Sequence, residues 1–135
     1  SGTANLVGIA GLGAGLRRIQ DIGIEQARAH LKTLARALIG GLSALPDITL
    51  YGTLDLDRSV AVVSFTVTGK RVSEIGFRLD QEYGILSRVG LHCAPAAHRT
   101  IRSFPEGTVR LAPGVFTTMD DIQQAIQAIG RIIQS

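Results

Sequence analysis

The chain has 135 residues, of which 45% are hydrophobic and 19% charged, a balance typical of one folded domain rather than a disordered segment. Its 14 basic and 11 acidic residues give a net charge of +3, and the basic residues are scattered along the chain. Only 4% of the residues are aromatic and none is Trp. This composition argues against a nucleic-acid partner, which calls for aromatic stacking platforms or a basic stripe.

Cysteine content and the course of hydropathy predict the compartment. Cys93 is the only cysteine, so an internal disulfide framework and a multi-cysteine metal site are excluded. A lone thiol is typical of a reducing compartment, and no apolar run reaches the roughly 18 residues that cross a bilayer. We therefore expect a cytoplasmic protein with no membrane partner. Because the chain does not begin with Met, we also expect it to have been processed or excised from a longer polypeptide.

Two helices are predicted in the first third of the chain. Residues 6–19 are apolar and contain four glycines, a pattern that indicates a helix requiring a closely packed partner surface. Apolar residues then recur at helical spacing over residues 24–45, with charged residues on the other faces. This second helix should be amphipathic and should end before Pro46.

Alternating strands and helices are predicted in the remainder. Gly84 should stop one helix as a left-handed cap, and Thr117 or Thr118 should cap a final helix with an isoleucine-rich face. The polar segment 92–107 should be a loop. The fold class is therefore α+β, with two layers: a small mixed or antiparallel sheet and helices mainly on one face. The expected strands are residues 48–51, 60–67, 85–91 and 108–112, and the expected third helix is residues 72–83.

The densest polar cluster begins where the third predicted strand runs into this loop. Residues 87–95 are followed by His98, Arg99 and Arg102, and they contain Cys93. A thiol becomes nucleophilic when neighbouring cations favour its thiolate form. The alternative is that Cys93 is a small buried apolar residue and the cations are merely solvated, and spacing alone leaves both readings open.

A zinc site and a phosphate-binding loop are two further possibilities that the sequence patterns support poorly. His92, Cys93 and His98 could ligate zinc, but no fourth ligand follows the usual spacing, and adjacent residues of an extended strand point to opposite faces. We therefore expect no metal site. The glycines of the first helix match no phosphate-binding fingerprint, although Gly2 and Thr3 could offer donors to a phosphate at its N-terminus.

Arg110 alternates with apolar neighbours in the last predicted strand. Such an arginine is usually a paired or snorkelling structural residue. Its forked guanidinium is also the side chain best suited to hold a carboxylate through two parallel hydrogen bonds.

Three motifs occur in an order that resembles a known family. They are Gly2-Thr3-Ala4-Asn5, then Arg88-Val89-Gly90-Leu91-His92-Cys93-Ala94-Pro95, then Arg110 ahead of Phe116-Thr117-Thr118. Over essentially the whole chain the sequence is similar to the C-terminal part of class V aminotransferases, in the cysteine desulfurase and selenocysteine lyase branch. The resemblance implies the small C-terminal domain of a fold type I pyridoxal-phosphate enzyme over residues 21–135. Residues 1–20 would be the helix that connects it to a large domain.

The resemblance also implies roles for individual residues. Arg110 matches the arginine that grips the substrate carboxylate, Arg88 matches a second active-site arginine, and His92 lies in the same substrate-binding segment. Cys93 matches the thiol that attacks the substrate sulfur. In the parent enzyme that thiol would take sulfur from L-cysteine as a persulfide and leave alanine.

For the cofactor and partners, the resemblance implies pyridoxal 5′-phosphate held in a homodimer, an amino-acid substrate (cysteine or selenocysteine) and a sulfur-acceptor protein. Gly2 and Thr3 match the segment that reaches the cofactor phosphate of the other subunit. Neither Lys32 nor Lys70 lies in a motif like that of the family's cofactor lysine, which falls upstream of the Gly-Thr-x-Asn segment. We therefore expect that this polypeptide alone neither binds the cofactor covalently nor turns over.

Three alternatives stay open. The missing lysine and the glycine-rich first helix are compatible with a non-catalytic ligand-binding or dimerisation module. The family pattern is altered at residues 112–114 and 116–117, which leaves room for another class V aminotransferase or lyase activity. A Cys–His hydrolase that pairs Cys93 with His92 or His98 is the third.

Overall fold

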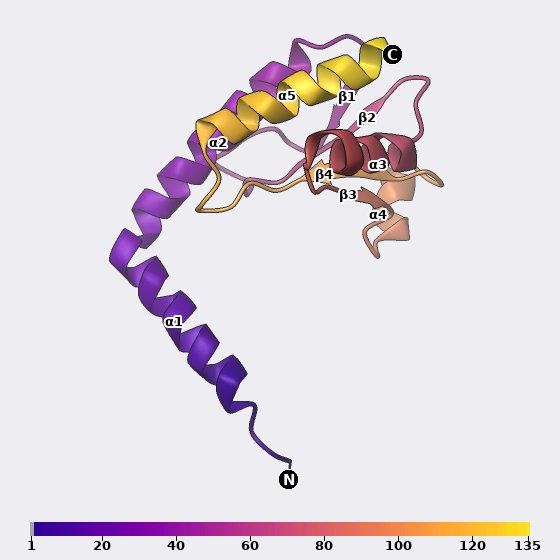
Figure 1. The fold of residues 1–135 in the computed structure, drawn as a ribbon. Coiled ribbons are helices and arrows are strands. Elements are labelled where there is room, and N and C mark those ends of the chain that lie inside the picture. Colours follow the sequence, from indigo (N-terminus) through magenta and orange to yellow (C-terminus); the bar gives the residue numbers. More distant parts are fainter. Residues whose placement is uncertain (1) are drawn as a thin grey trace. The chain divides into compact units, whose positions relative to one another are not determined.

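The computed structural model describes residues 2–135, and the chain divides into two compact units, one ending at His30 and one formed by Leu31–Ser135. Figure 1 shows the elements in chain order. They are α1 (Leu6–Ile22), α2 (Ile24–Ser43), β1 (Ile48–Tyr51), β2 (Val63–Val67), α3 (Val72–Tyr83), β3 (Arg88–Gly90), α4 (Pro95–Thr100), β4 (Thr108–Leu111) and α5 (Met119–Gln134).

In the first unit, α1 begins at Asn5, whose side-chain oxygen accepts a hydrogen bond from the Gly8 N–H at 2.9 Å. The helix runs three residues beyond the predicted segment and stops at Gly23, which has φ +84°. None of its residues is buried. Five of its large apolar side chains are more than half exposed: Leu6, Val7, Ile9, Leu12 and Leu16.

The second unit is built on a four-stranded sheet with the order β1-β2-β4-β3. Every neighbouring pair is antiparallel. The strand β4 lies between β2 and β3, although α3, β3 and α4 separate it from β2 in the sequence. The predicted small sheet with helices is confirmed, and its strands are antiparallel.

One face of this sheet is the hydrophobic core. In β2, Val63, Phe65 and Val67 are buried while Ser64 and Thr66 are only half-buried, as expected when successive side chains point to opposite faces. Helical residues complete the same cluster: Leu34, Leu38 and Leu42 from α2, Val72, Ile75 and Leu79 from α3, and Ile122, Ala128, Ile129 and Ile132 from α5. The helices therefore cover one face, as predicted, and the other face stays polar.

Capping residues determine where α3 ends and where α5 begins. Gly84 ends α3 in the left-handed conformation, with φ +65° and ψ +23°, and its N–H reaches the carbonyls of Leu79 and Asp80. Thr118, rather than Thr117, caps α5: its hydroxyl accepts from the Asp121 N–H at 3.2 Å, and the Asp121 carboxylate accepts from the Thr118 N–H at 2.7 Å. The hydrogen bonds that the Thr118 N–H and hydroxyl donate to the carboxylate lower the pKa of Asp121.

Three predicted strands are too long, the last of them (108–112) by one residue, and the predicted loop is not wholly irregular. The second strand begins at Val63, because the Val62 N–H bonds back to the Val60 carbonyl and turns the chain. The strand β3 has three residues, each of which pairs with β4. The segment 92–107 contains the short helix α4, which starts at Pro95, a residue suited to the first helical position. No helix of residues 2–135 is long and apolar enough to cross a membrane.

Candidate functional site

The candidate site is built on the polar face of the sheet, where two arginines stand opposite each other. Arg88 of β3 and Arg110 of β4 are direct cross-strand partners. Residues directly opposite in an antiparallel pair share a face, with Cβ atoms about 4.5–5.5 Å apart. Val109 and Leu111, the neighbours of Arg110, are buried in the core, so both guanidinium groups rise from the opposite face. Ser64 of β2 flanks Arg110 on its other side.

Among residues 2–135, neither arginine forms an ion pair with an acidic side chain. The ion pairs found there are Lys32–Asp57 and Arg78–Glu82, and the side chain of Arg88 donates a hydrogen bond to sulfur. Like charges directly opposite on a sheet repel. An anion between the two guanidinium groups would relieve that repulsion, and a carboxylate matches their planar donor geometry.

The thiol of Cys93 lies beside this pair. Cys93 is exposed, and Arg88 Nη2 is 3.7 Å from its Sγ. After β3 ends at Gly90, the chain turns back, with the Ala94 N–H bonded to the Leu91 carbonyl at 2.8 Å. The exposed sulfur thus has a guanidinium as its hydrogen-bonding neighbour.

The two central residues of this turn have unusual backbone angles. His92 has φ +50° and Cys93 has φ +61°, a region that favours glycine and strains residues with a Cβ. The expectation that they sit on an extended strand with side chains on opposite faces is therefore wrong, because the strand has already ended. Neither residue 92 nor residue 93 is a glycine, so surrounding contacts must hold the turn.

His92 is held from several sides. Its Nε2 is 3.1 Å from the hydroxyl of Thr108, and its ring centroid is 5.5 Å from that of His98. Its Nδ1 is buried without a hydrogen-bond partner among the described residues. Burial, followed by the charges of Arg110, His98 and Arg88, lowers the pKa of His92. The imidazole is therefore neutral at neutral pH, adjacent to the thiol and to both arginines.

The remaining predicted residues belong to other segments of the chain. Gly2 and Thr3 belong to the first unit and are exposed, and the cap of α1 is Asn5 rather than Thr3. Lys32 forms an ion pair with Asp57, and Lys70 follows β2, where its N–H bonds to the Val67 carbonyl. No group of three or more metal-binding side chains occurs within the described part of the chain.

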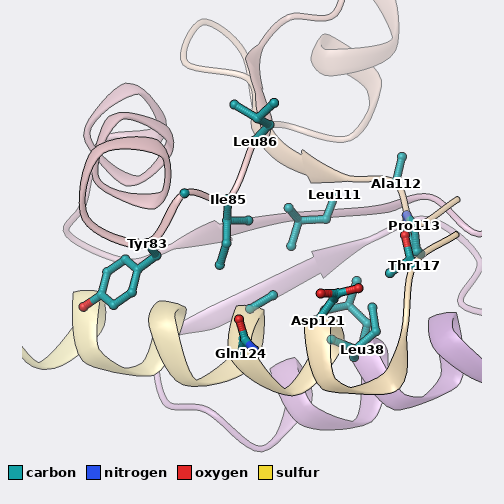
Figure 2. A pocket seen from close by; sticks show the side chains of 13 residues that line it. Leu38, Tyr83, Ile85, Leu86, Leu111, Ala112, Pro113, Thr117, Asp121 and Gln124 are labelled. Carbon is teal, nitrogen blue, oxygen red and sulfur yellow. The ribbon is translucent and has the colours of Figure 1, made fainter.

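A pocket of about 280 Å³ lies away from this cluster. Figure 2 shows it between the end of α3, the residues after β4 and α5, with Tyr83, Ile85, Leu111 and Gln124 on its walls. None of the predicted site residues lines it. The thiol and arginines lie on the other face of the sheet, so the pocket and the cluster of chemically reactive side chains are two separate places.

Two residues that support the site were missed by sequence reasoning. Thr108 precedes Arg110 by two positions in the same strand, so the strand period of two already placed it on the polar face. Ser103 bonds to His98 and is buried. No local pattern marks Ser103, because its partner is brought to it by the turn after α4.

Comparisons with known proteins show the family to which the chain belongs. The family model described as Aminotransferase class-V matches residues 1–125. A probable cysteine desulfurase of Pyrococcus abyssi is 30% identical over 135 residues, which is all of this chain and 33% of that protein. A cysteine desulfurase of Synechococcus elongatus is 36% identical over 132 residues, covering 98% of this chain and 20% of that protein.

Solved structures of cysteine desulfurases have the same fold as this chain. The apo structure of a cysteine desulfurase from Thermococcus onnurineus superposes with a TM-score of 0.90 at 28% identity, over 99% of this chain and 32% of the other. A cysteine desulfurase from Escherichia coli, solved in an S-sulfonic acid form, gives a TM-score of 0.88 at 26% identity, over 99% and 32%. The chain thus spans a third or less of the length of these relatives. By sequence and by fold, it belongs to the class V aminotransferase family.

Proposed function

We propose that this chain contributes the sulfur-accepting thiol and the carboxylate-binding arginines of a pyridoxal-phosphate-dependent cysteine desulfurase. The observation that carries the proposal is the arrangement of Arg88, which is the cross-strand partner of Arg110 and also lies 3.7 Å from Cys93 Sγ. One residue thus links the anion-binding pair to the nucleophile. The cysteine desulfurases among its relatives support the same substrate class.

The arginines orient the substrate in this proposal. Arg110, half-buried and flanked by Ser64, holds the α-carboxylate of L-cysteine, and Arg88 contributes a second positive charge. A guanidinium–carboxylate pair restricts both position and rotation because its two hydrogen bonds are parallel. The substrate side chain can then reach Cys93 on the neighbouring turn. Neutral His92 fills the space between the strand and the thiol without adding a third positive charge.

Cys93 acts as the nucleophile. Its thiolate attacks the substrate sulfur, an S–S bond forms, and the carbon–sulfur bond of the substrate breaks with its electron pair passing to the carbon skeleton. A proton taken up at that carbon completes alanine, and Cys93 is left as a persulfide. The sum of the step is cysteine plus a thiol giving alanine plus a persulfide, so no external oxidant or reductant is consumed. An acceptor protein would then take the sulfur.

The cofactor is assigned to the family rather than to residues seen around the thiol. Pyridoxal phosphate, when bound, serves as the electron sink that makes the carbon–sulfur bond labile. The described cluster fits the substrate side of such a site: it has cations and a thiol, and neither of the two lysines belongs to it. In a homodimer, Gly2 and Thr3 of one subunit would contact the cofactor phosphate bound in the other subunit. A single exposed thiol also favours a reducing, cytoplasmic location.

The test is Cys93→Ala in the full-length protein. Alanine formation from cysteine should be abolished, because the acceptor of the substrate sulfur is gone, while the visible absorbance of the bound cofactor is retained. Thr100→Ala is the matched control, since Thr100 is exposed on the nearby helix α4 and its hydroxyl bonds only to the Ala96 carbonyl. Normal alanine formation by Cys93→Ala would overturn the proposal.

A second experiment addresses the 135-residue chain by itself. We expect no covalent cofactor adduct when the chain is mixed with pyridoxal phosphate and treated with borohydride. Lys32 is engaged with Asp57 and Lys70 lies in the turn after β2. Intact-mass measurement gives the answer: a stoichiometric mass increase that disappears in Lys32→Arg or Lys70→Arg would show that the chain carries its own cofactor lysine.

A further inference from the structure

A buried histidine behind the turn is not used by the proposed chemistry. His98 lies on α4 and is 4% exposed. Its Nδ1 is 2.7 Å from the hydroxyl of Ser103, which is itself buried. The His98 carbonyl also accepts the N–H groups of Ser103 and Phe104, at 2.9 and 3.2 Å. His98 therefore connects α4 to the chain that returns into β4.

The same histidine contacts the turn that carries the thiol. The His98 N–H bonds to the carbonyl of Ala94, the residue after Cys93, at 3.2 Å. The His98 ring faces that of His92, with centroids 5.5 Å apart and planes tilted by 48°. The hydroxyl of Thr108, a residue that is 1% exposed, lies 3.1 Å from the His92 Nε2. The His92 side chain thus contacts two buried residues.

These contacts of His92 with His98 and Thr108 explain how a turn without glycine is kept in place. Positive φ angles at residues with a Cβ persist only where surrounding structure over-determines them. Here the turn carries His92 and Cys93 at φ +50° and φ +61°, and the contacts that hold it come from His98 and Thr108. If the turn relaxed, Cys93 Sγ would lose its position next to Arg88.

We propose that His98, fixed by Ser103, is a positioning residue that holds the His92–Cys93 turn so that Cys93 Sγ stays beside the Arg88 guanidinium. This inference deepens the proposed function, because it concerns the thiol named there as the nucleophile. His98 touches neither substrate nor cofactor in this role. It acts through His92 and the backbone of the turn.

The test measures the rate at which iodoacetamide alkylates Cys93 in the full-length protein at one neutral pH, followed on the Cys93 peptide by mass spectrometry. Cys93 is already exposed, so a loosened turn adds little access, and the rate reports whether the Arg88 guanidinium still lies beside the sulfur. Arg88→Gln should slow alkylation about threefold because the cation is removed. His98→Ala should slow it by a similar factor.

Conservative variants separate positioning from simple packing. The amide of His98→Asn can occupy the place of Nδ1 and bond to Ser103, so it should restore most of the rate. The longer His98→Gln places its amide nearer the Nε2 position and should not. Thr100→Ala, on the same helix, should react at the wild-type rate.

Each outcome decides the matter. A wild-type or faster rate in a folded His98→Ala protein, an equally slow His98→Asn, or an unchanged Arg88→Gln would overturn the proposal. If circular dichroism shows that His98→Ala does not fold, Ser103→Ala takes its place: a slower rate supports the proposal and an unchanged rate overturns it. Alkylation needs no turnover, so these results are independent of whether Cys93→Ala still forms alanine, the outcome that decides the proposed function.

Discussion

The two faces of the sheet follow different rules although the same strands form both. On the face covered by α2, α3 and α5, alternate residues such as Phe65 and Val109 are fully buried. On the other face stand Ser64, Arg88 and Arg110, with two like charges in direct register. Stability is thus concentrated on the buried face. The polar face can therefore keep two like charges side by side, an unfavourable arrangement that a bound anion would relieve.

The core face should show the largest effect on stability. Phe65→Ala removes a fully buried ring from the central strand β2 and should lower the free energy of unfolding by about 3–5 kcal/mol. Thr49→Ala, at an exposed position of β1, should change it by no more than about 0.5 kcal/mol. Urea denaturation of both variants measures the contrast. Similar losses in the two would mean that burial does not distinguish the faces.

At Gly107, the residue before β4, the expected loss of stability is somewhat smaller. Gly107 has φ +80°, and a Cβ there would lie 2.1 Å from the carbonyl carbon and oxygen of Gly90. Gly107→Ala should therefore cost about 2–4 kcal/mol through backbone strain and overpacking, and should slow Cys93 alkylation because β3 is displaced. Gly114→Ala meets nothing within 4 Å and serves as the control. Unchanged stability and alkylation in Gly107→Ala would show that this close approach is dispensable.

The polar face should respond in the opposite direction. Arg110→Gln relieves the repulsion from Arg88 and should raise the free energy of unfolding by about 0.2–1 kcal/mol. In the full-length enzyme the same change should raise the KM for cysteine about ten- to a hundredfold, because a charge-assisted carboxylate contact is lost. Arg78→Gln is the contrasting control: Arg78 is paired with Glu82, so its loss should slightly destabilise the protein and leave the KM unchanged.

The pH dependence of stability gives the smallest effect. The pKa of His92 is lowered in the folded protein, first by burial and then by Arg110, His98 and Arg88. Between that folded value and the unfolded value of about 6.5, the unfolded chain binds more protons, so stability falls as the pH drops below about 6.5 and is fully present above it. His92→Gln should flatten that part of the stability curve. A slope as steep as the wild type's would assign the effect to another group.

The fold was largely predictable because its local signals are strong. The period of two in β2, the helical spacing of α3 and α5, and the caps at Gly84 and Thr118 are all legible in the residues themselves. Strand ends were less predictable. A strand ends where its pairing ends, and Arg88–Gly90 pairs with β4 over only three residues. The helix α4 escaped notice because six residues carry too little periodicity.

The sequence alone identified the candidate site residues: one cysteine, its neighbouring histidine and two arginines, in an order that resembles a known family. Tertiary structure decided how they meet. Cross-strand register set Arg88 opposite Arg110, and a turn at positive φ, contacted by His98 and Thr108, brought Cys93 next to Arg88. The reason is physical: composition and periodicity report which face a residue takes within its own element, whereas register, turn geometry and buried side-chain contacts depend on segments that approach only when the chain folds.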